Sequence, residues 1–92
     1  MSEGITIVFD EAKRESNLAK HGYDFLDLTT EWFETAAIVP TKRRNRLMAV
    51  GGFGEVTIVV IVQPLGGQGI SIISMRHASA KERKHHASRR SN

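Results

Sequence analysis

Residues 69–84 read GISIISMRHASAKERK, and this stretch decides the fold that the sequence predicts. Apolar residues alternate through its first half, which predicts a β-strand over 69–76. A capping box of the form S-x-x-E begins at Ser79 and predicts the start of a helix. Two residues that can carry positive charge, Arg76 and His77, lie between the strand and the helix. This joint suits an anionic ligand, and RNA is the first candidate.

The period of two residues in a strand predicts which side chains of this stretch share a face. One face would carry Ile70, Ile72, Ser74 and Arg76. If the two isoleucines pack against helices, Arg76 leaves that apolar face only because the strand ends there.

The totals indicate one small domain in 92 residues. The chain has no cysteine, which excludes disulfides and thiolate metal sites and fits a reducing compartment. The longest apolar run, 56–62, is far shorter than the ~20 residues of a membrane helix, and the N-terminus lacks a signal-peptide pattern. We therefore expect a cytoplasmic protein that contacts no membrane, with its domain at 1–84 and a basic flexible tail at 85–92.

Charge is distributed unevenly along the chain. Residues 1–40 contain three lysines or arginines and eight acidic residues, whereas residues 41–92 contain ten and two. A basic half of this kind is typical of a protein that binds a polyanion or an acidic partner. The alternative is that the two halves neutralise each other within the fold.

The first half of the chain predicts a strand followed by two helices. A short apolar run at 5–9 is the expected strand. Asp10 is the expected N-cap of a helix that ends near His21, with Gly22 at the position that favours glycine. A second helix is predicted over 25–34, and its amphipathic pattern makes it the main cover of the sheet.

The remaining strands surround a basic loop, TKRRNR, at 41–46. Glycines and an aromatic residue at 51–54 predict a hairpin connection, and the run at 55–62 predicts a central strand buried on both faces. The other two strands are expected at 36–39 and 47–50. The fold class is therefore α+β: an antiparallel sheet of three to five strands, two N-terminal helices packed on it, and a short C-terminal helix.

Two segments of the chain resemble the BrnT family of type II toxins. Residues 9–25, FDEAKRESNLAKHGYDF, match the family pattern W-D-x-x-K-x-x-x-N-x-x-K-H-G-x-x-F. Residues 72–83, IISMRHASAKER, resemble the family's I-I-S-A-R … A … E-R, with Met75 in the place of the alanine. The resemblance extends roughly over 5–84, and the first of the two patterns is specific for a chain of this length.

The resemblance implies a RelE-like fold and a ribonuclease that inhibits translation without a metal or other cofactor. It also implies a cognate antitoxin, a BrnA-like ribbon-helix-helix protein. The toxin would contact DNA only indirectly, through this antitoxin. None of these properties follows from composition or periodicity.

Three departures from the family pattern leave a second reading open. Phe9 replaces the usual tryptophan, Val62 and Gln63 replace a common aromatic-threonine pair, and the loop before Leu47 is short and basic. The last two fall near the expected RNA-facing surface. The alternative is a catalytically degenerate module that binds an antitoxin or nucleic acid without cleaving; a third possibility is a plain nucleic-acid-binding domain.

Four residues are the predicted catalytic groups. RNA cleavage by the 2′-hydroxyl needs cations that stabilise the phosphoryl oxygens and groups that transfer protons. Arg76 and Arg46 suit phosphate contact because the guanidinium is planar and permanently charged. Lys20 and His21 belong to the first family pattern, and a histidine can transfer protons near neutral pH. The alternatives are an ion pair of Arg76 with a carboxylate of the acidic half and a helix-end position for His21.

The predicted nucleic-acid-binding residues are cations of the basic loop and of the last helix: Lys42, Arg43, Arg44, Lys81 and Arg83. The loop could equally be a solvated surface. No metal site is expected, because His77, His85 and His86 lack the fixed orientation of a ligand cage.

Overall fold

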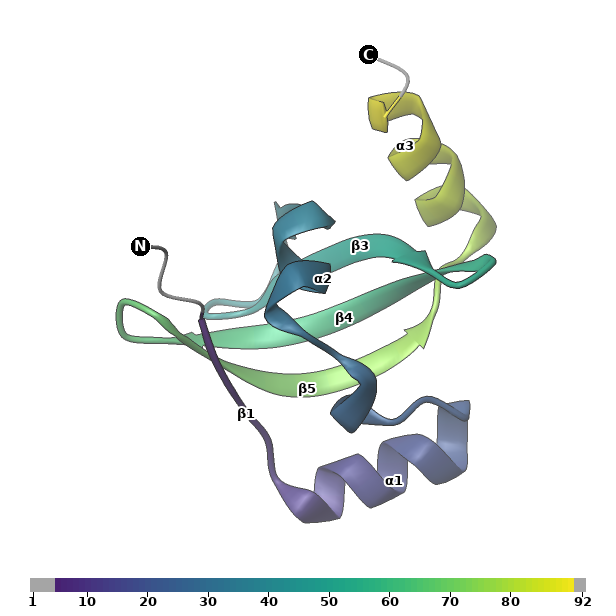
Figure 1. Ribbon diagram of the computed structural model, residues 1–92. Coiled ribbons are helices and arrows are strands. Elements are labelled where there is room, and N and C mark those ends of the chain that lie inside the picture. Colours follow the sequence, from purple (N-terminus) through teal and green to yellow (C-terminus); the bar gives the residue numbers. More distant parts are fainter. Residues whose placement is uncertain (1–4, 91–92) are drawn as a thin grey trace.

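A five-stranded sheet organises the computed structural model, which describes residues 5–90 (Figure 1). Three helices and one 3-10 turn, η1, pack around it. In chain order, the elements are β1 (Thr6–Val8), α1 (Glu11–His21), η1 (Phe25–Asp27), α2 (Thr30–Thr35), β2 (Ala37–Pro40), β3 (Leu47–Phe53), β4 (Val56–Leu65), β5 (Gly69–His77) and α3 (Ala80–Arg90). The α+β class is therefore confirmed.

The sheet is mixed rather than antiparallel. The strand order is β1-β5-β4-β3-β2, in which β1 pairs parallel with β5 and the other neighbours pair antiparallel. The prediction of an antiparallel sheet is wrong at β1, because that strand joins a partner more than sixty residues away and nothing local sets their direction. The run at 55–62 does form the middle strand, β4, with Val59 and Val60 fully buried.

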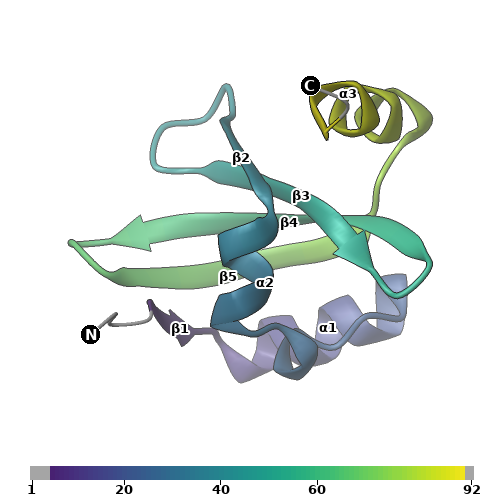
Figure 2. The same ribbon diagram turned by 45° about the horizontal axis from the view of Figure 1, so that its top comes forward.

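The helices cover both faces of the sheet. The segment from α1 to α2 packs on one face, and α3 lies on the opposite face (Figure 2). The main core lies under the first of these faces, where Phe25, Leu28 and Phe33 contact the strands. Strand residues in that core are Ala49, Ile58, Val60, Val62, Ile72 and Met75. A smaller cluster of Val50, Val59 and Ala78 lies on the α3 side.

A bulge in β5 changes the expected face of Arg76. Ser74 pairs with Ile61 but Ile72 pairs with Val62, so Ile73 is an extra residue between them. Past this bulge, Arg76 pairs with Val59 on the α3 side, while Ile72 remains in the main core. The predicted shared face of these residues is therefore wrong, because one inserted residue reverses every later side chain.

The predicted helix over 25–34 is broken in two. Asp24 begins only the short turn η1, where its side chain accepts a hydrogen bond from the Leu26 N–H. Thr29 then adopts an extended conformation and caps α2 by accepting from the Trp32 N–H at 3.1 Å. The second cap competes with a continuous helix, and the break allows Leu28 to enter the core.

Strand β3 continues through the glycines that were predicted to form a hairpin connection. Gly51 and Gly52 are paired with β4, and the turn lies at Gly54, which has a positive φ of 63°. The indole of Trp32 lies over Gly51, and its Nε1 donates to the Gly52 carbonyl at 2.7 Å. Glycine is needed here so that the ring can lie on the backbone.

We expect Gly51→Ala to destabilise the fold by about 1–3 kcal/mol, the usual cost of overpacking. A Cβ at this position would lie 3.1 Å from Trp32 Cζ2. Gly52→Ala is the matched control, because nothing lies within 4 Å of a Cβ there. Urea denaturation of both variants measures the difference, and equal midpoints would show that the indole moves away without cost.

Helix α3 is longer than predicted. It runs to Arg90 and so includes most of the residues predicted to form a tail from His85. His86 is buried against the rest of the chain, which holds the helix past the expected end. Residues 91–92 of the predicted tail lie outside the described residues. Over 5–90, no helix combines the length and apolar composition that crossing a bilayer requires.

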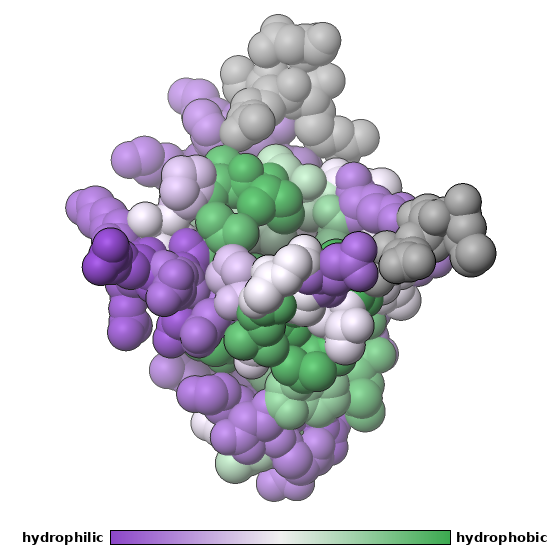
Figure 3. Space-filling view, turned by 90° about the vertical axis from the view of Figure 1, so that its left-hand side faces the viewer, coloured by the Kyte–Doolittle hydropathy of each residue, from purple (hydrophilic) through white to green (hydrophobic). Residues whose placement is uncertain are grey.

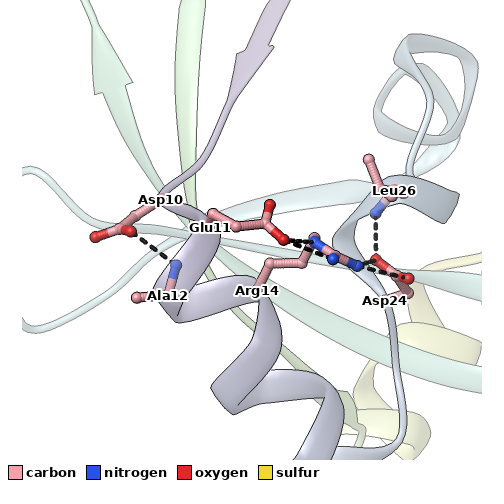
Figure 4. A network of polar contacts seen from close by, with 6 residues as sticks. All are labelled: Asp10, Glu11, Ala12, Arg14, Asp24 and Leu26. Carbon is pink, nitrogen blue, oxygen red and sulfur yellow. Dashed lines mark hydrogen bonds and ion pairs between the residues drawn. The ribbon is translucent and has the colours of Figure 1, made fainter.

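Arg14 joins the start of α1 to the loop that follows the helix (Figure 4). Its Nη1 donates to both carboxylate oxygens of Asp24 at 3.0 Å, and its Nη2 donates to Glu11 Oε2 at 2.6 Å. The contact with Arg14 lowers the pKa of Glu11, and the Leu26 N–H together with Arg14 lowers the pKa of Asp24. These bonds hold the two ends of the α1–η1 segment together.

Candidate functional site

Asn17 fixes α1 along the free edge of β5. Strand β1 covers β5 only as far as Ser71, so the outer edge beyond it lacks a strand partner within residues 5–90. Asn17 takes the place of that partner: its Nδ2 donates to the Met75 carbonyl at 2.9 Å, and its Oδ1 accepts from the Met75 N–H at 3.1 Å. Nδ2 also donates to the Tyr23 carbonyl, and the side chain is buried. The amide therefore satisfies an edge that would otherwise be open.

A groove of about 380 Å³ lies between α1 and β5 beside Asn17. We call it the α1 groove. Helix α1 supplies most of its lining, and β5 supplies the two residues at the bulge. The lining residues are Ala12, Lys13, Ser16, Asn17, Lys20, His21, Ile73 and Ser74. Two lysines, one histidine and two serines are therefore among the residues that line one small open space.

The cations of the α1 groove are available to a ligand. Lys13 and Lys20 are exposed, and neither belongs to an ion pair with another described residue. The ion pairs of Arg14 with Glu11 and Asp24 lie within the acidic half of the chain, and that of Arg76 with Glu82 lies within the basic half. The surface charges of the α1 groove are thus free to attract an anion.

His21 lies at the last position of α1, directly before Gly22. Gly22 adopts the left-handed conformation with φ 80°, and its N–H donates to the Leu18 carbonyl at 2.9 Å. The helix limits predicted from Asp10 and Gly22 are confirmed. The charge of Lys20 in the same last turn complements the helix dipole, so this end of α1 has a structural role as well as a place in the groove.

Tyr23 and His77 form a pair that sequence reasoning missed. The Tyr23 hydroxyl and His77 Nδ1 are 2.7 Å apart, although the residues are 54 positions apart in the chain. Both lie beyond Asn17, which holds the Tyr23 backbone and the end of β5 together. No signal in the sequence links the two residues, because only the packing of α1 on β5 brings them together.

Arg76 is held by Glu82 rather than open to solvent. Its Nη1 and Nη2 donate to the two carboxylate oxygens of Glu82, each at 2.9 Å. The same carboxylate accepts from the Ser79 N–H at 2.8 Å, and Ser79 Oγ accepts from the Glu82 N–H. The predicted capping box is therefore confirmed, and Arg76 ties it to the end of β5. The alternative expected a carboxylate of the acidic half; the ion pair is present, but its partner, Glu82, belongs to the basic half.

The ion pair with Arg76 lowers the pKa of Glu82 from 4.5 to about 2. Because this pKa is lower in the folded than in the unfolded state, the ionised Glu82 carboxylate stabilises the fold above pH 4.5. This stabilisation is lost as the pH falls towards 2 and the carboxylate is protonated. We expect a loss of about 1–2 kcal/mol in that window, less than the full shift implies because the Arg76 side chain is one-third exposed.

Urea denaturation of the wild-type chain and Glu82→Gln between pH 5 and pH 2 measures this contribution. Glu11 and Asp24 also have lowered pKa values, so the comparison uses the difference between the two proteins at each pH. A difference that does not change with pH would show that Arg76 gives Glu82 no net stabilisation.

Arg46 lies elsewhere in the fold. Its Nη1 donates to Gln63 Oε1 at 2.8 Å, and Gln63 is one of the positions that depart from the family pattern. Gln63 and Val59, the strand partner of Arg76, are four residues apart on β4, which corresponds to roughly 13 Å. The structure therefore brings Lys20 and His21 into one groove but places neither Arg46 nor Arg76 in its lining.

The predicted nucleic-acid-binding residues occupy two separate places. Lys42, Arg43 and Arg44 are exposed in the loop between β2 and β3. Lys81 and Arg83 lie on α3, where Arg83 donates to the Ala78 carbonyl at 3.0 Å. Both groups are accessible, and neither lines the α1 groove.

Comparison with protein families decides the class of the chain. Residues 9–82 match the model described as "Ribonuclease toxin, BrnT, of type II toxin-antitoxin system". The chain belongs to the BrnT family. The predicted family is therefore confirmed, and the chain is a member of a family of ribonuclease toxins from type II toxin–antitoxin systems.

A solved BrnT toxin has the same fold. The chain is similar to the crystal structure of the Brucella abortus ribonuclease toxin BrnT, with 50% sequence identity and a TM-score of 0.76 over 82% of this chain and 97% of that one. A comparison with curated protein sequences finds no match.

The two segments that carry the BrnT resemblance meet at the α1 groove. Residues 9–25 supply Lys13, Asn17, Lys20 and His21, and residues 72–83 supply Ile73 and Ser74. Within 5–90, no three histidine, aspartate or glutamate side chains gather as metal ligands would. The two BrnT segments thus form one groove, which is lined by lysines, serines and one histidine.

Proposed function

We propose that this BrnT-family chain is a ribonuclease that cleaves RNA in the α1 groove without a metal and so inhibits translation. The observation that carries the proposal is the convergence of Lys13, Lys20 and His21 with Ser74 of β5 around one open space. The ammonium groups are unpaired among the described residues, so they can take up a phosphate.

The residues of the groove suit transfer of a phosphoryl group within RNA. The 2′-oxygen of the substrate forms a bond to the neighbouring phosphorus while the bond from phosphorus to the 5′-oxygen breaks. In this proposal, the His21 imidazole accepts the proton of the 2′-hydroxyl, and the leaving 5′-oxygen takes up a proton from solvent water. Lys13 and Lys20 stabilise the charge that develops on the phosphoryl oxygens. The products are a 2′,3′-cyclic phosphate and a 5′-hydroxyl.

The experiment is cleavage of single-stranded RNA by the purified chain, with and without EDTA, beside expression in growing cells. We expect cleavage that EDTA does not inhibit, cyclic-phosphate ends on the products, and growth arrest on expression. If the chain cleaves neither free nor ribosome-bound RNA and its expression does not arrest growth, the proposal is contradicted. Inhibition by EDTA would reject its metal-independent step.

Arg76 has a smaller expected role in catalysis than the sequence predicted. Its guanidinium is committed to Glu82, so we expect Arg76→Ala to reduce cleavage less than tenfold in protein that is folded. The same variant should lose about 1–2 kcal/mol of stability because the strand–helix joint opens. RNA cleavage measured at a temperature where both proteins are folded gives the result. A decrease in RNA cleavage of more than a hundredfold would show that Arg76 acts in catalysis.

The partner of the toxin follows from the same proposal. Type II systems pair a toxin with a protein antitoxin, and we propose a BrnA-like ribbon-helix-helix antitoxin as the cognate partner in the cytoplasm. Contact with DNA would then be made by the antitoxin. The exposed loop cations, such as Arg43 and Arg44, would guide RNA or an acidic partner towards the protein.

A second candidate function is a module that binds its antitoxin without cleaving RNA. The observation in its favour is that Arg46 and Arg76 are each bonded to another side chain and lie apart. A chain that binds antitoxin tightly but neither cleaves RNA nor arrests growth would match this alternative.

A further inference from the structure

A second groove, of about 700 Å³, lies on the other face of the sheet. We call it the α3 groove. Its floor is aliphatic and comes from the two strands at one edge of the sheet: Ala37 and Val39 of β2, and Met48 and Val50 of β3. Figure 3 shows hydrophobic surface in the upper part of this face of the molecule, with hydrophilic surface beside it. Apolar surface in a recess of this size marks a binding site more often than a solvated face.

The rim of the α3 groove is basic. Lys81 and Lys84 of α3 line it and are exposed, and neither has an ion pair within residues 5–90. Glu82 is the acid among its lining residues, and Arg76 neutralises it. The basic loop at 41–46 follows directly after Pro40 at the end of β2.

We propose that the α3 groove is the docking site of an acidic amphipathic segment of the antitoxin. Apolar side chains of that segment would fill the aliphatic floor, and its carboxylates would face Lys81 and Lys84. The proposal rests on the proposed function for the existence of an antitoxin. It adds a place and a chemistry: the antitoxin and the RNA use opposite sides of the molecule, with the α1 groove left to the RNA.

The floor of the α3 groove favours a protein segment over RNA. Sites for single-stranded nucleic acid combine cations with aromatic rings on which bases stack. No phenylalanine, tyrosine or tryptophan is among the described residues that line this groove. Met48 is half-buried in the floor, and methionine adapts its shape to apolar partners. Aliphatic floor and basic rim together match an amphipathic acidic peptide.

Two variants test the docking site without touching the α1 groove. Met48→Glu places a carboxylate in the floor, and Lys84→Glu reverses one charge of the rim. Met48→Leu is the matched control, because it keeps the floor apolar at nearly the same volume. Thermal denaturation first shows that each variant is folded. The probe is the purified protein encoded by the reading frame adjacent to that of this chain, with binding measured by calorimetry.

We expect Met48→Glu to weaken binding of that antitoxin at least a hundredfold and Lys84→Glu at least tenfold, with Met48→Leu within threefold of wild type. RNA cleavage by all three variants should stay within threefold of wild type. Unchanged antitoxin affinity in folded Met48→Glu would overturn the proposal. So would a loss of RNA cleavage with antitoxin binding intact, because the groove would then serve the RNA.

The same measurements separate this proposal from the proposed ribonuclease. A wild-type chain that cleaves no RNA but loses antitoxin binding on Met48→Glu would reject the ribonuclease and support the docking site. A chain that cleaves RNA, and binds antitoxin equally well with and without Met48→Glu, would support the ribonuclease and reject the docking site.

Discussion

His21→Ala is expected to slow RNA cleavage by about 10²–10⁴-fold, the usual contribution of a positioned acid–base group. His21 lines the α1 groove and lies one turn of helix after Asn17. It is the single imidazole among the described lining residues of this groove. Its removal leaves the ammonium groups in place, so RNA binding should change far less than the rate of cleavage.

The comparison for His21 needs a control that also removes an imidazole. His85→Ala serves, because that side chain is exposed on α3 at the opposite face of the sheet. Rates of cleavage across a range of pH are the measurement, and the variant should lose the limb of the profile that belongs to the base. A rate within threefold of wild type would leave His21 as a helix-end residue only.

Variants of Lys20 test whether its ammonium group binds the phosphate of the RNA. Lys20→Ala should reduce cleavage and weaken RNA binding together, because it removes a charge that meets the phosphate in both ground and transition states. Lys20→Arg should restore part of both effects. Recovery of binding without recovery of the rate would show that the position of the ammonium group matters for the chemistry.

Asn17→Ala is expected to destabilise the fold by about 3–4 kcal/mol. The variant loses three hydrogen bonds and leaves the Met75 N–H and carbonyl without their partner at a buried site. Each unsatisfied buried group costs about 1–3 kcal/mol, and a small domain has about 5–15 kcal/mol in total. Loss of this amide should also loosen α1 from β5 and so disturb the α1 groove.

The stability of Asn17→Ala is measured by urea denaturation against Glu15→Ala, an exposed change in the same helix that should cost less than about 0.5 kcal/mol. Asn17→Asp is a second comparison, because it keeps the acceptor for the Met75 N–H and loses the donor to both carbonyls. A cost below about 1 kcal/mol for the alanine variant would mean that water takes over the edge of β5.

Local signals in the sequence predicted much of the fold correctly. Asp10 and Gly22 mark the ends of α1, and Ser79 with Glu82 forms the capping box that starts α3. The apolar run at 55–62 is the middle strand. The helix ends depend on bonds between groups a few residues apart, and the strand depends on a run of neighbouring apolar residues, so the chain itself contains the information.

Features that depend on distant partners were predicted wrongly or missed. The bulge at Ile73 decides on which face Arg76 lies, and it is visible only in the pairing of β5 with β4. The broken second helix follows from the packing of Leu28 and the cap at Thr29. The candidate site shows the same division: Lys20 and His21 are neighbours on one helix, whereas Ser74 joins them only through the tertiary fold.

Residues 69–84 contain both halves of this result. By itself the sequence determined that a strand would run into a capped helix with Arg76 and His77 at the joint, because alternation and capping act over a few residues. Only the tertiary structure decided what each of the two does there. Arg76 bonds to the capping carboxylate of Glu82, and His77 meets Tyr23 across 54 positions of chain. The contact of His77 with Tyr23 forms only when packing brings distant segments together, whereas Arg76 and Glu82 are six positions apart and meet at the joint of β5 and α3.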